Sequence, residues 1–388
     1  MITGGFTYLA VLVGLAGALK FLARRNAGRF FEYVPPIVLL YFGVMLLSTL
    51  GLWSRTESVD ATYGAVRNNL LPAMIFLMLL KSDLRQIRKL GGRMLIAFCA
   101  ASLSIALGFV VAFALFKGLL DANAWKAFAA LSGSWMGGTG NMVAIQGALS
   151  VPDSSMGYTL LIDSIDYAIW VVFLLALVPY ARFFNHWSGA DTGEIDTVGS
   201  RLEREGETAG TPIEVTDLLF LTGLSLLVSA GVQAGAGELP TGAFMTTTTW
   251  TVIIVTVLGV VAALTGLARM AGSMEIATVM LYVIVALIAS RANFTELTQA
   301  PAYIIAGLVV LAVHGLCMVG IARLLRLDLF TCGVASLANI GGVASAPILA
   351  AAYSQALIPI GVLMAMLGYI IGTAGGLLVG RVLSMIAS

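Results

Sequence analysis

Charged residues are scarce in this chain of 388 residues. Asp, Glu, Lys and Arg together make up 11% of the sequence, whereas hydrophobic residues make up 59%. Soluble domains carry about 25% charged residues, so this composition excludes an ordinary soluble domain. The scarcity of charge, with a mean hydropathy of +0.98, predicts an integral membrane protein. No basic stripe lies outside the short loops, so we expect no nucleic-acid partner.

Cysteine is also rare, and the motifs of soluble enzymes are missing. Cys99, Cys317 and Cys332 lie in apolar segments without the spacing of metal ligands, so we interpret them as packing residues. The chain has no Walker loop, no HExxH motif and no nucleophile elbow. We therefore expect no enzyme activity, no cofactor and no ATP-driven mechanism.

Apolar runs of about 20 residues, the length that spans a bilayer, recur along the whole chain. In the first half they predict helices near residues 5–23, 34–53, 64–80, 94–116 and 157–180, with a motif segment at 124–150. In the second half they predict helices near 215–236, 246–268, 273–290, 301–322 and 356–380, with a motif segment at 329–353. The same order in both halves predicts an all-α polytopic protein of two repeats, 1–182 and 215–388, joined by a polar linker at 183–214.

The two motif segments share a Gly-Gly pair inside apolar sequence. Gly137-Gly138 aligns with Gly341-Gly342, and Asn141 aligns with Ser345. An unpaired backbone group in hydrocarbon is costly, so broken backbone is tolerated there only when it is buried in protein or lines a watery cavity. One such break in each half is the pattern of a transporter whose binding site lies near the bilayer midplane.

Basic residues predict the orientation of the helices. Lys and Arg are concentrated after the first helix (Lys20, Arg24, Arg25 and Arg29) and in the segment 81–93 after the third. Placing both in the cytoplasm puts the N-terminus outside. The first apolar stretch lacks a basic leader and a cleavage site, so we predict a retained transmembrane helix.

The motif segments decide how the two halves are related. If each is a re-entrant hairpin, with arms such as 124–135 and 139–150, each half crosses the membrane five times and the repeats are inverted. If each is a broken helix that crosses once, the basic segment 81–93 lies on the same side as 291–300, which is not basic. We favour the hairpins, because each arm is too short to span a bilayer.

Several stretches resemble the YjcL-like integral membrane family, also called domain of unknown function 819. The resemblance covers most of the chain and rests on Gly133–Asn141, His314–Asp328, Ala338–Gly342 and Pro359–Gly372. Family members often place a proline soon after the second Gly pair, whereas four residues separate Gly342 from Pro347 here. The family implies no activity. The architecture is more distantly similar to the sodium-coupled glutamate symporters, a likeness of fold that does not determine function.

Candidate substrate-binding residues come from the two motifs. Exposed backbone, hydroxyls and amides could bind a small solute, and oxygens of Thr139, Asn141 and Asn339 could bind Na⁺. The full set is Ser134, Trp135, Gly137, Gly138, Thr139, Asn141, Asn339, Gly341, Gly342 and Ser345. The alternative for the glycines is close helix packing, which membrane helices often achieve with small residues.

Ionisable residues inside apolar segments are candidates for the coupling ion, Na⁺ or H⁺. Asp163 and Asp166 lie three residues apart, on one helix face, and Glu275 and His314 lie in later helices. The alternative is a polar contact between helices. Asp153, beside Pro152, is expected to be exposed in a loop.

These residues predict a secondary active transporter of a small polar or anionic organic solute, coupled to Na⁺ or H⁺ and working by alternating access. We expect it in a bacterial cytoplasmic (inner) membrane, and the sequence leaves open whether it forms a homodimer. Three alternatives remain. They are a cation/proton antiporter whose carboxylates form the whole site, an intramembrane enzyme with a pair such as Asp166 and His314, and a channel.

Overall fold

The computed structural model describes residues 1–25, 36–82, 84–190, 212–242, 245–296, 300–354 and 357–387. This part of the chain is almost entirely helical, and an isolated bridge between Ile2 and Trp53 is its only extended pairing. Most of the predicted linker lies outside the described residues. Its first part forms a short helix, α10 (Ala181–Ser188), in which Asn185 accepts a hydrogen bond from the backbone of Leu329.

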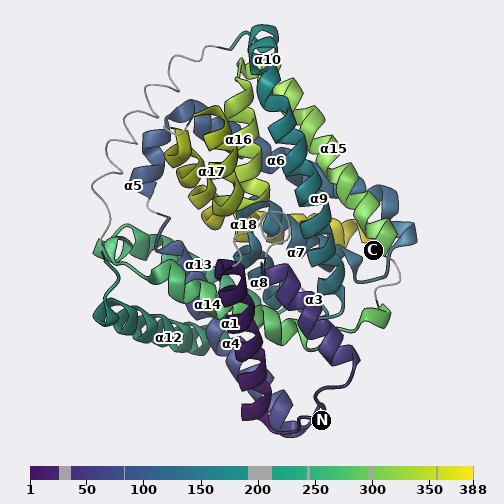
Figure 1. The fold of residues 1–388 in the computed structure, drawn as a ribbon, viewed down its shortest axis with the longest axis vertical. Coiled ribbons are helices and arrows are strands. Elements are labelled where there is room, and N and C mark those ends of the chain that lie inside the picture. Colours follow the sequence, from purple (N-terminus) through teal and green to yellow (C-terminus); the bar gives the residue numbers. More distant parts are fainter. Residues whose placement is uncertain are drawn as a thin grey trace.

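The helices follow the predicted order in each half (Figure 1). The first half contains α1 (Gly5–Arg25), α3 (Pro36–Thr49), α4 (Glu57–Leu79), α5 (Leu84–Ile87), α6 (Gly92–Phe116), α7 (Ala124–Gly137), α8 (Thr139–Ala148) and α9 (Ser155–Leu177). The second half contains α12 (Val215–Gly237), α13 (Thr247–Ala263), α14 (Ser273–Ala289), α15 (Ala300–Leu325), α16 (Leu329–Ile340), α17 (Gly342–Tyr353) and α18 (Ile358–Ala387).

Several predicted boundaries are wrong by five or more residues. Helix α18 ends at Ala387 instead of near residue 380, and α13 ends at Ala263 instead of near residue 268. Helix α4 begins at Glu57 instead of near residue 64, because Thr56 caps it by accepting a hydrogen bond from the backbone N–H of Val59. The first turns of α4 are polar, so the apolar run in this region begins later than the helix does.

Length and composition identify the helices that can cross a membrane. Among the described residues, six are long and apolar enough: Gly5–Arg25, Gly92–Leu119, Ser155–Ser188, Val215–Gly237, Ala300–Leu325 and Ile358–Ala387. Shorter apolar helices include Pro36–Thr49, Thr247–Ala263 and Ser273–Ala289. The expected all-α membrane architecture is therefore confirmed.

Each motif segment consists of two short helices that fold back on each other. Gly138, with a φ of +90°, forms the turn between α7 and α8, where a side chain would be strained. Across this pair, a Cβ added to Gly133 would lie 3.4 Å from the carbonyl oxygen of Asn141. The second turn lies between α16 and α17, and the rings of Phe330 and Tyr353 at their far ends are only 5.3 Å apart.

The long helix α18 packs on the first hairpin through glycine. Gly368, Gly372, Gly376 and Gly380 recur at every fourth position, so they form one stripe on the helix surface. A Cβ added to Gly376 would lie 3.0 Å from Gly133 of α7, and one added to Gly380 would lie 2.9 Å from the Cβ of Ala129. The two backbones approach this closely only because the stripe carries no side chains.

The helices build two hydrophobic cores. One core is formed largely by α6, α7, α9, α15, α16 and α18, and the other largely by α1, α3, α4, α8, α12, α13 and α14. Figure 1 shows the second group mainly in the lower part of the view, with α9, α15, α16 and α17 above it and α7 and α18 between. The molecule therefore has two packed bodies that meet at the hairpins.

Candidate functional site

A cavity of about 310 Å³ lies where the two hairpin turns come together. The first turn contributes Gly138, Thr139 and Gly140, and the second contributes Gly341 and Gly342. The other described residues that line it are Lys20, Ile37, Val38, Met78, Ser134, Asp163, Tyr167, Met274, Ala277, Thr278, Leu281, Tyr282, Ile340, Val343 and Tyr369. These residues come from both hydrophobic cores, so the cavity lies between the two bodies.

Asp163 of α9 is the acidic residue on the cavity wall. Its Oδ1 accepts hydrogen bonds from the hydroxyl of Ser134 at 3.1 Å and from the indole N–H of Trp135 at 3.0 Å. Both donors belong to α7, one turn before the Gly pair. Because both groups donate to the same oxygen, they fix the orientation of the carboxylate.

Lys20 supplies a positive charge on the same wall. Its Nζ lies 5.3 Å from the centre of the Tyr282 ring, which also lines the cavity. Lys20 was counted with the basic residues that follow the first helix, but it lies within α1, which continues to Arg25. From the sequence alone, Lys20 was only a signal for the orientation of the helices.

Trp135 lies behind the wall of the cavity. Its side chain is fully buried, and its ring centre lies 5.5 Å from that of Phe109 of α6. Its hydrogen bond to Asp163 makes it a positioning residue for that carboxylate.

The two predicted asparagines are also enclosed by protein. Asn141 donates to the carbonyl of Gly137 at 2.7 Å and accepts from the hydroxyl of Thr373 at 2.5 Å, which joins α8 to α18. Asn339 accepts from the hydroxyl of Ser102 at 2.7 Å and donates to the carbonyl of Ala335 at 2.9 Å, which joins α16 to α6. Buried amides need such partners, and these contacts hold the hairpins in place.

The remaining predicted substrate-binding residues form two groups, those that line the cavity and those that pack against protein elsewhere. Ser134, Gly138, Thr139, Gly341 and Gly342 line the cavity. Gly137 packs instead against Gly368 and Gly372, and the hydroxyl of Ser345 donates to the carbonyl of Leu337 at 3.5 Å.

Asp166 lies one turn further along α9 and does not line this cavity. It is fully buried against α15, where a Cβ added to Gly307 would lie 3.1 Å from its carboxyl carbon. Among the described residues, neither of its oxygens has a hydrogen-bond partner. An ionised carboxylate in such surroundings would be very costly, so we expect Asp166 to carry a proton here.

His314 of α15 belongs to a separate network of hydrogen bonds. Its Nδ1 lies 2.6 Å from the hydroxyl of Ser104 and its Nε2 lies 2.8 Å from that of Ser336, which also accepts from the indole N–H of Trp170. Ser104 donates to the carbonyl of Ala101, so Ser104 is left to accept from Nδ1–H while Ser336 donates to Nε2. This arrangement satisfies a neutral imidazole.

Asp166 and His314, the example of a catalytic pair considered for an intramembrane enzyme, therefore do not contact each other through a hydrogen bond. The ring of His314 is occupied by two serines, and Asp166 has no hydrogen-bond partner among the described residues.

Glu275 lines a second cavity, of about 480 Å³, between α1 and α14. Lys20, Thr278 and Tyr282 line both cavities, so the two spaces adjoin.

Comparison with known proteins agrees with this architecture. Residues 10–386 match the model of the family described as Protein of unknown function (DUF819). The chain belongs to this family. It is 24% identical to the Uncharacterized membrane protein YjcL of Bacillus subtilis (strain 168), over 394 residues that cover 96% of this chain and 94% of that protein. The resemblance drawn from the motifs is confirmed, and the chain is an integral membrane protein.

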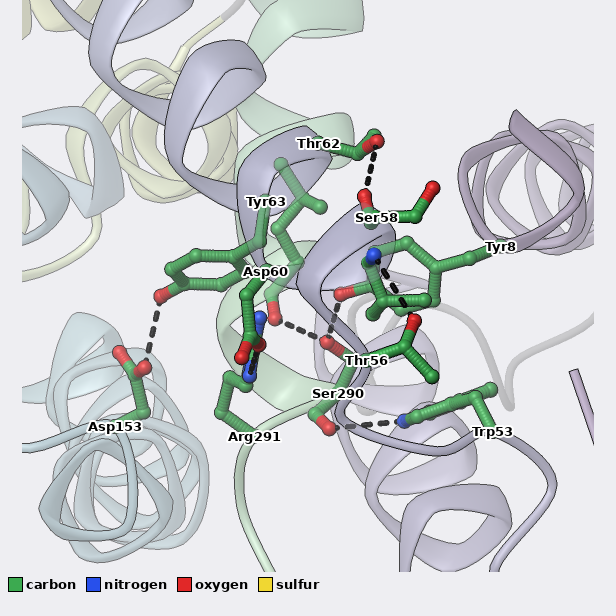
Figure 2. Close-up of polar contacts among 12 residues, drawn as sticks. Tyr8, Trp53, Thr56, Ser58, Asp60, Thr62, Tyr63, Asp153, Ser290 and Arg291 are labelled. Atoms are coloured by element: carbon green, nitrogen blue, oxygen red, sulfur yellow. Dashed lines mark hydrogen bonds and ion pairs between the residues drawn. The ribbon is translucent and has the colours of Figure 1, made fainter. Parts of the chain in front are cut away.

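Sequence reasoning missed a polar cluster of this DUF819 protein. The Asp153 cluster comprises Asp60, Tyr63, Arg67, Gln146, Asp153 and Arg291. We expected Asp153 to be exposed, but its carboxylate accepts from the Tyr63 hydroxyl at 2.7 Å (Figure 2). It also accepts from the Gln146 amide at 2.9 Å. Arg67 donates to Gln146 at 2.6 Å. Burial raises the pKa of the Asp153 carboxyl, and the nearby Arg67 guanidinium opposes that rise.

The Asp153 cluster continues to the end of α14. Arg291 pairs with Asp60 and lies 4.3 Å from the centre of the Tyr63 ring. Its neighbour Ser290 bonds to the Tyr8 hydroxyl and accepts from the Trp53 indole N–H at 3.0 Å, as Figure 2 shows. These bonds join α1, α4 and α14 to the open end of the first hairpin. Polar residues at 67 and 146 within apolar sequence were the signal that could have revealed it.

The Tyr63→Phe variant tests the strength of this cluster. It keeps the ring beneath Arg291 but removes the hydroxyl that donates to Asp153, so we expect a loss of about 1–3 kcal/mol in the free energy of unfolding at neutral pH. The hydroxyl stabilises the ionised carboxylate, so this loss should shrink as the pH falls through the raised pKa of Asp153. Thermal unfolding across pH measures it. The exposed Tyr180→Phe is the control, and equal effects of the two substitutions would contradict the prediction.

Proposed function

We propose that this DUF819 protein is a secondary active transporter that carries a small polar organic solute and is driven by protons. The observation that carries the proposal is a cavity that both Gly-pair turns line. Backbone at a helix break can bind a solute directly, and a site shared by two repeats is characteristic of such carriers. A volume of about 310 Å³ also exceeds what a bare cation needs, which favours an organic solute over a cation/proton antiporter.

In this proposal the two halves are inverted repeats with re-entrant hairpins. Contacts between chain segments that should lie on one side of the membrane support it. Trp53, after the second helix, contacts Ser290, and Lys81, after the third, donates to the carbonyl of Met270 at 2.9 Å. At the far end of α6, Lys117 donates to the carbonyl of Ile386 at 2.8 Å. If each motif crossed the membrane once, Trp53 and Ser290 would lie on opposite sides, and so would Lys81 and Met270, whereas Lys117 and Ile386 would share a side in either case.

The packing of equivalent helices supports the same relation. Helices α4 and α14 occupy the same place in the two halves and pack against each other, and so do α6 and α15. A pair of equivalent elements in contact is what a pseudo-two-fold axis between inverted repeats produces.

The position of the cavity supports an inward-facing state. Lys20, Met78 and Met274 line it close to the helix ends that we assign to the cytoplasm. The Asp153 cluster closes the opposite end, where the first hairpin meets α4 and α14. Opening outward would separate the two bodies there and break these polar contacts.

Asp166 is the proposed proton carrier. A Na⁺ site needs several oxygen ligands, but Asp166 has no polar partner among the described residues, and the amide oxygens of Asn141 and Asn339 already accept hydrogen bonds. A buried carboxyl group without polar partners can still bind a proton, because a proton does not need several oxygen ligands. Asp166 becomes free to release it when α9 and α15 move and water reaches the site.

A substitution that fills the cavity tests the proposal. Thr278→Trp places a large ring in the space, whereas Thr222→Trp on α12 is a matched control, because both threonines donate to the carbonyl four residues earlier at 2.7 Å. In proteoliposomes with an imposed pH gradient, we expect Thr278→Trp to lose at least about 90% of solute uptake while Thr222→Trp keeps it.

The opposite result would overturn the proposal. Proton flux that depends on Na⁺, needs no solute and survives in Thr278→Trp would show a cation/proton antiporter. Uptake that persists unchanged in Thr278→Trp would show that the cavity is not the solute site.

A further inference from the structure

Resting on the proposed function, we infer that the solute is a small zwitterion with an apolar body, of the class of amino acids with uncharged side chains. Its ammonium group binds Asp163, and its carboxylate binds the part of the wall formed by Lys20 and the hairpin turns.

The charged residues on the cavity wall indicate this class of solute. Among the described residues that line the cavity, Lys20 is positive, Asp163 is negative, and the others are uncharged in their usual forms. A dicarboxylate would bring two negative charges to one positive group and face Asp163 as well. An organic cation would leave Lys20 uncompensated. Lys20 is an exposed residue of α1, whereas Asp163 is partly buried, so the cost of an unpaired charge falls mainly on Asp163. A solute with one charge of each sign complements both groups.

Asp163 is prepared to bind a cationic group. Ser134 and Trp135 both donate to Oδ1, which fixes the orientation of the carboxylate. A carboxylate has about four acceptor sites, so the hydrogen bonds from Ser134 and Trp135 leave capacity for an ammonium group. A preorganised carboxylate loses little entropy when it binds.

The hairpin turns favour the anionic end of the solute. Thr139 and Gly140 begin α8, and Gly342 and Val343 begin α17, and all four line the cavity. The first N–H groups of a helix have no partner within it, and the helix dipole makes this end positive. Lys20 adds a full positive charge to the same cavity.

The rest of the wall favours an apolar body. Three tyrosines, Tyr167, Tyr282 and Tyr369, line it together with Met78 and Leu281. The volume lies near the lower limit of ligand cavities, which run from about 300 to 1,000 Å³. A single amino acid suits this space better than a peptide.

Ligand-linked thermal stability of the full-length protein tests the inference. The probes are L-leucine, L-methionine and L-alanine as zwitterions, leucinamide as a cation, N-acetyl-leucine as a monoanion, and L-glutamate and succinate as acidic solutes. We expect one or more zwitterions to raise the unfolding temperature in a concentration-dependent manner, and the others to have little effect, because a ligand that binds only the folded state stabilises it.

Two substitutions link the effect to the charges. Asp163→Asn and Lys20→Gln should each raise the Kd for the best zwitterion about 10- to 100-fold. Asp163→Asn should weaken N-acetyl-leucine less than leucine, because the acetylated amine no longer needs the carboxylate. Lys126→Gln is the matched control, since Lys126 lies 5.6 Å from the Trp125 ring without lining the cavity.

The outcomes separate this inference from the proposed function. Stabilisation by glutamate, succinate or leucinamide that the zwitterions do not share would overturn the inference and leave a solute carrier standing. Equal Kd values in Asp163→Asn, Lys20→Gln and Lys126→Gln would also overturn it. No effect of any solute, together with Na⁺-dependent proton flux, would overturn both.

Discussion

Gly137→Ala is expected to lower the free energy of unfolding by more than about 3 kcal/mol, although it adds a single methyl group. The new Cβ would point at the backbone of α18, 2.9 Å from Gly372 Cα and in direct collision with the carbonyl oxygen of Gly368. Neither atom belongs to a flexible side chain, so relief would require α7 and α18 to separate. Because α18 packs along most of α7, separation would disturb all the close contacts that α7 makes with α18 between Ala129 and Gly137.

Thermal unfolding in detergent measures this loss, with size-exclusion profiles as a check on assembly. Gly231→Ala in α12 is the control, because a Cβ there would meet no atom within 4 Å. Gly375→Ala in α18 is a second control, since its Cβ would lie 3.1 Å from the end of the flexible Met136 side chain. Similar unfolding temperatures for Gly137→Ala and both controls would mean that α7 and α18 do not pack this closely.

Asp166→Asn is expected to abolish proton-driven accumulation while leaving exchange of solute across the membrane. An amide resembles the protonated acid in shape and charge, so the variant should fold and bind solute but should be unable to release a proton. With one proton per solute, a gradient of one pH unit supports about tenfold accumulation, or about 1.4 kcal/mol. In Asp166→Asn this ratio should fall to about one.

Proteoliposomes with imposed pH gradients measure both the accumulation of solute and its exchange across the membrane. Asp217→Asn, which changes an acidic residue in the first turn of α12, is the control and should accumulate solute normally. Accumulation by Asp166→Asn at the wild-type level would rule out Asp166 as the carrier. Accumulation by the wild type that requires a Na⁺ gradient and ignores pH would replace the proton with Na⁺.

The hairpin turns were the part of the site that sequence could locate. Glycine pairs inside apolar segments are rare because a broken helix exposes backbone groups, so their positions predicted both turns. The structure describes α7 and α8 meeting at Gly138, and α16 and α17 meeting at Gly341. Asp163 was predicted in a similar way, because an ionisable residue inside an apolar helix is costly and is therefore a candidate for function.

The role of each polar side chain could not be predicted in this way. Asn141 and Asn339 looked like ligands, yet their amides are used by Thr373 and Ser102, which are far away in the sequence. Asp163 and Asp166 lie one turn apart, but α7 supplies donors to one and Gly307 of α15 encloses the other. Lys20 looked like a signal for orientation until α1 and α14 placed it at the cavity.

The sequence by itself determined that this protein lies in a membrane, that it is helical, and where its chain breaks and turns. These properties depend on local composition, because each segment must satisfy its own backbone in hydrocarbon. Only the tertiary structure decided which groups meet. It brought the two turns to one cavity, joined Tyr63 to Asp153 and Asp60 to Arg291, and left Asp166 without a partner among the described residues. Partners contributed by distant helices depend on how those helices pack, which no local pattern records.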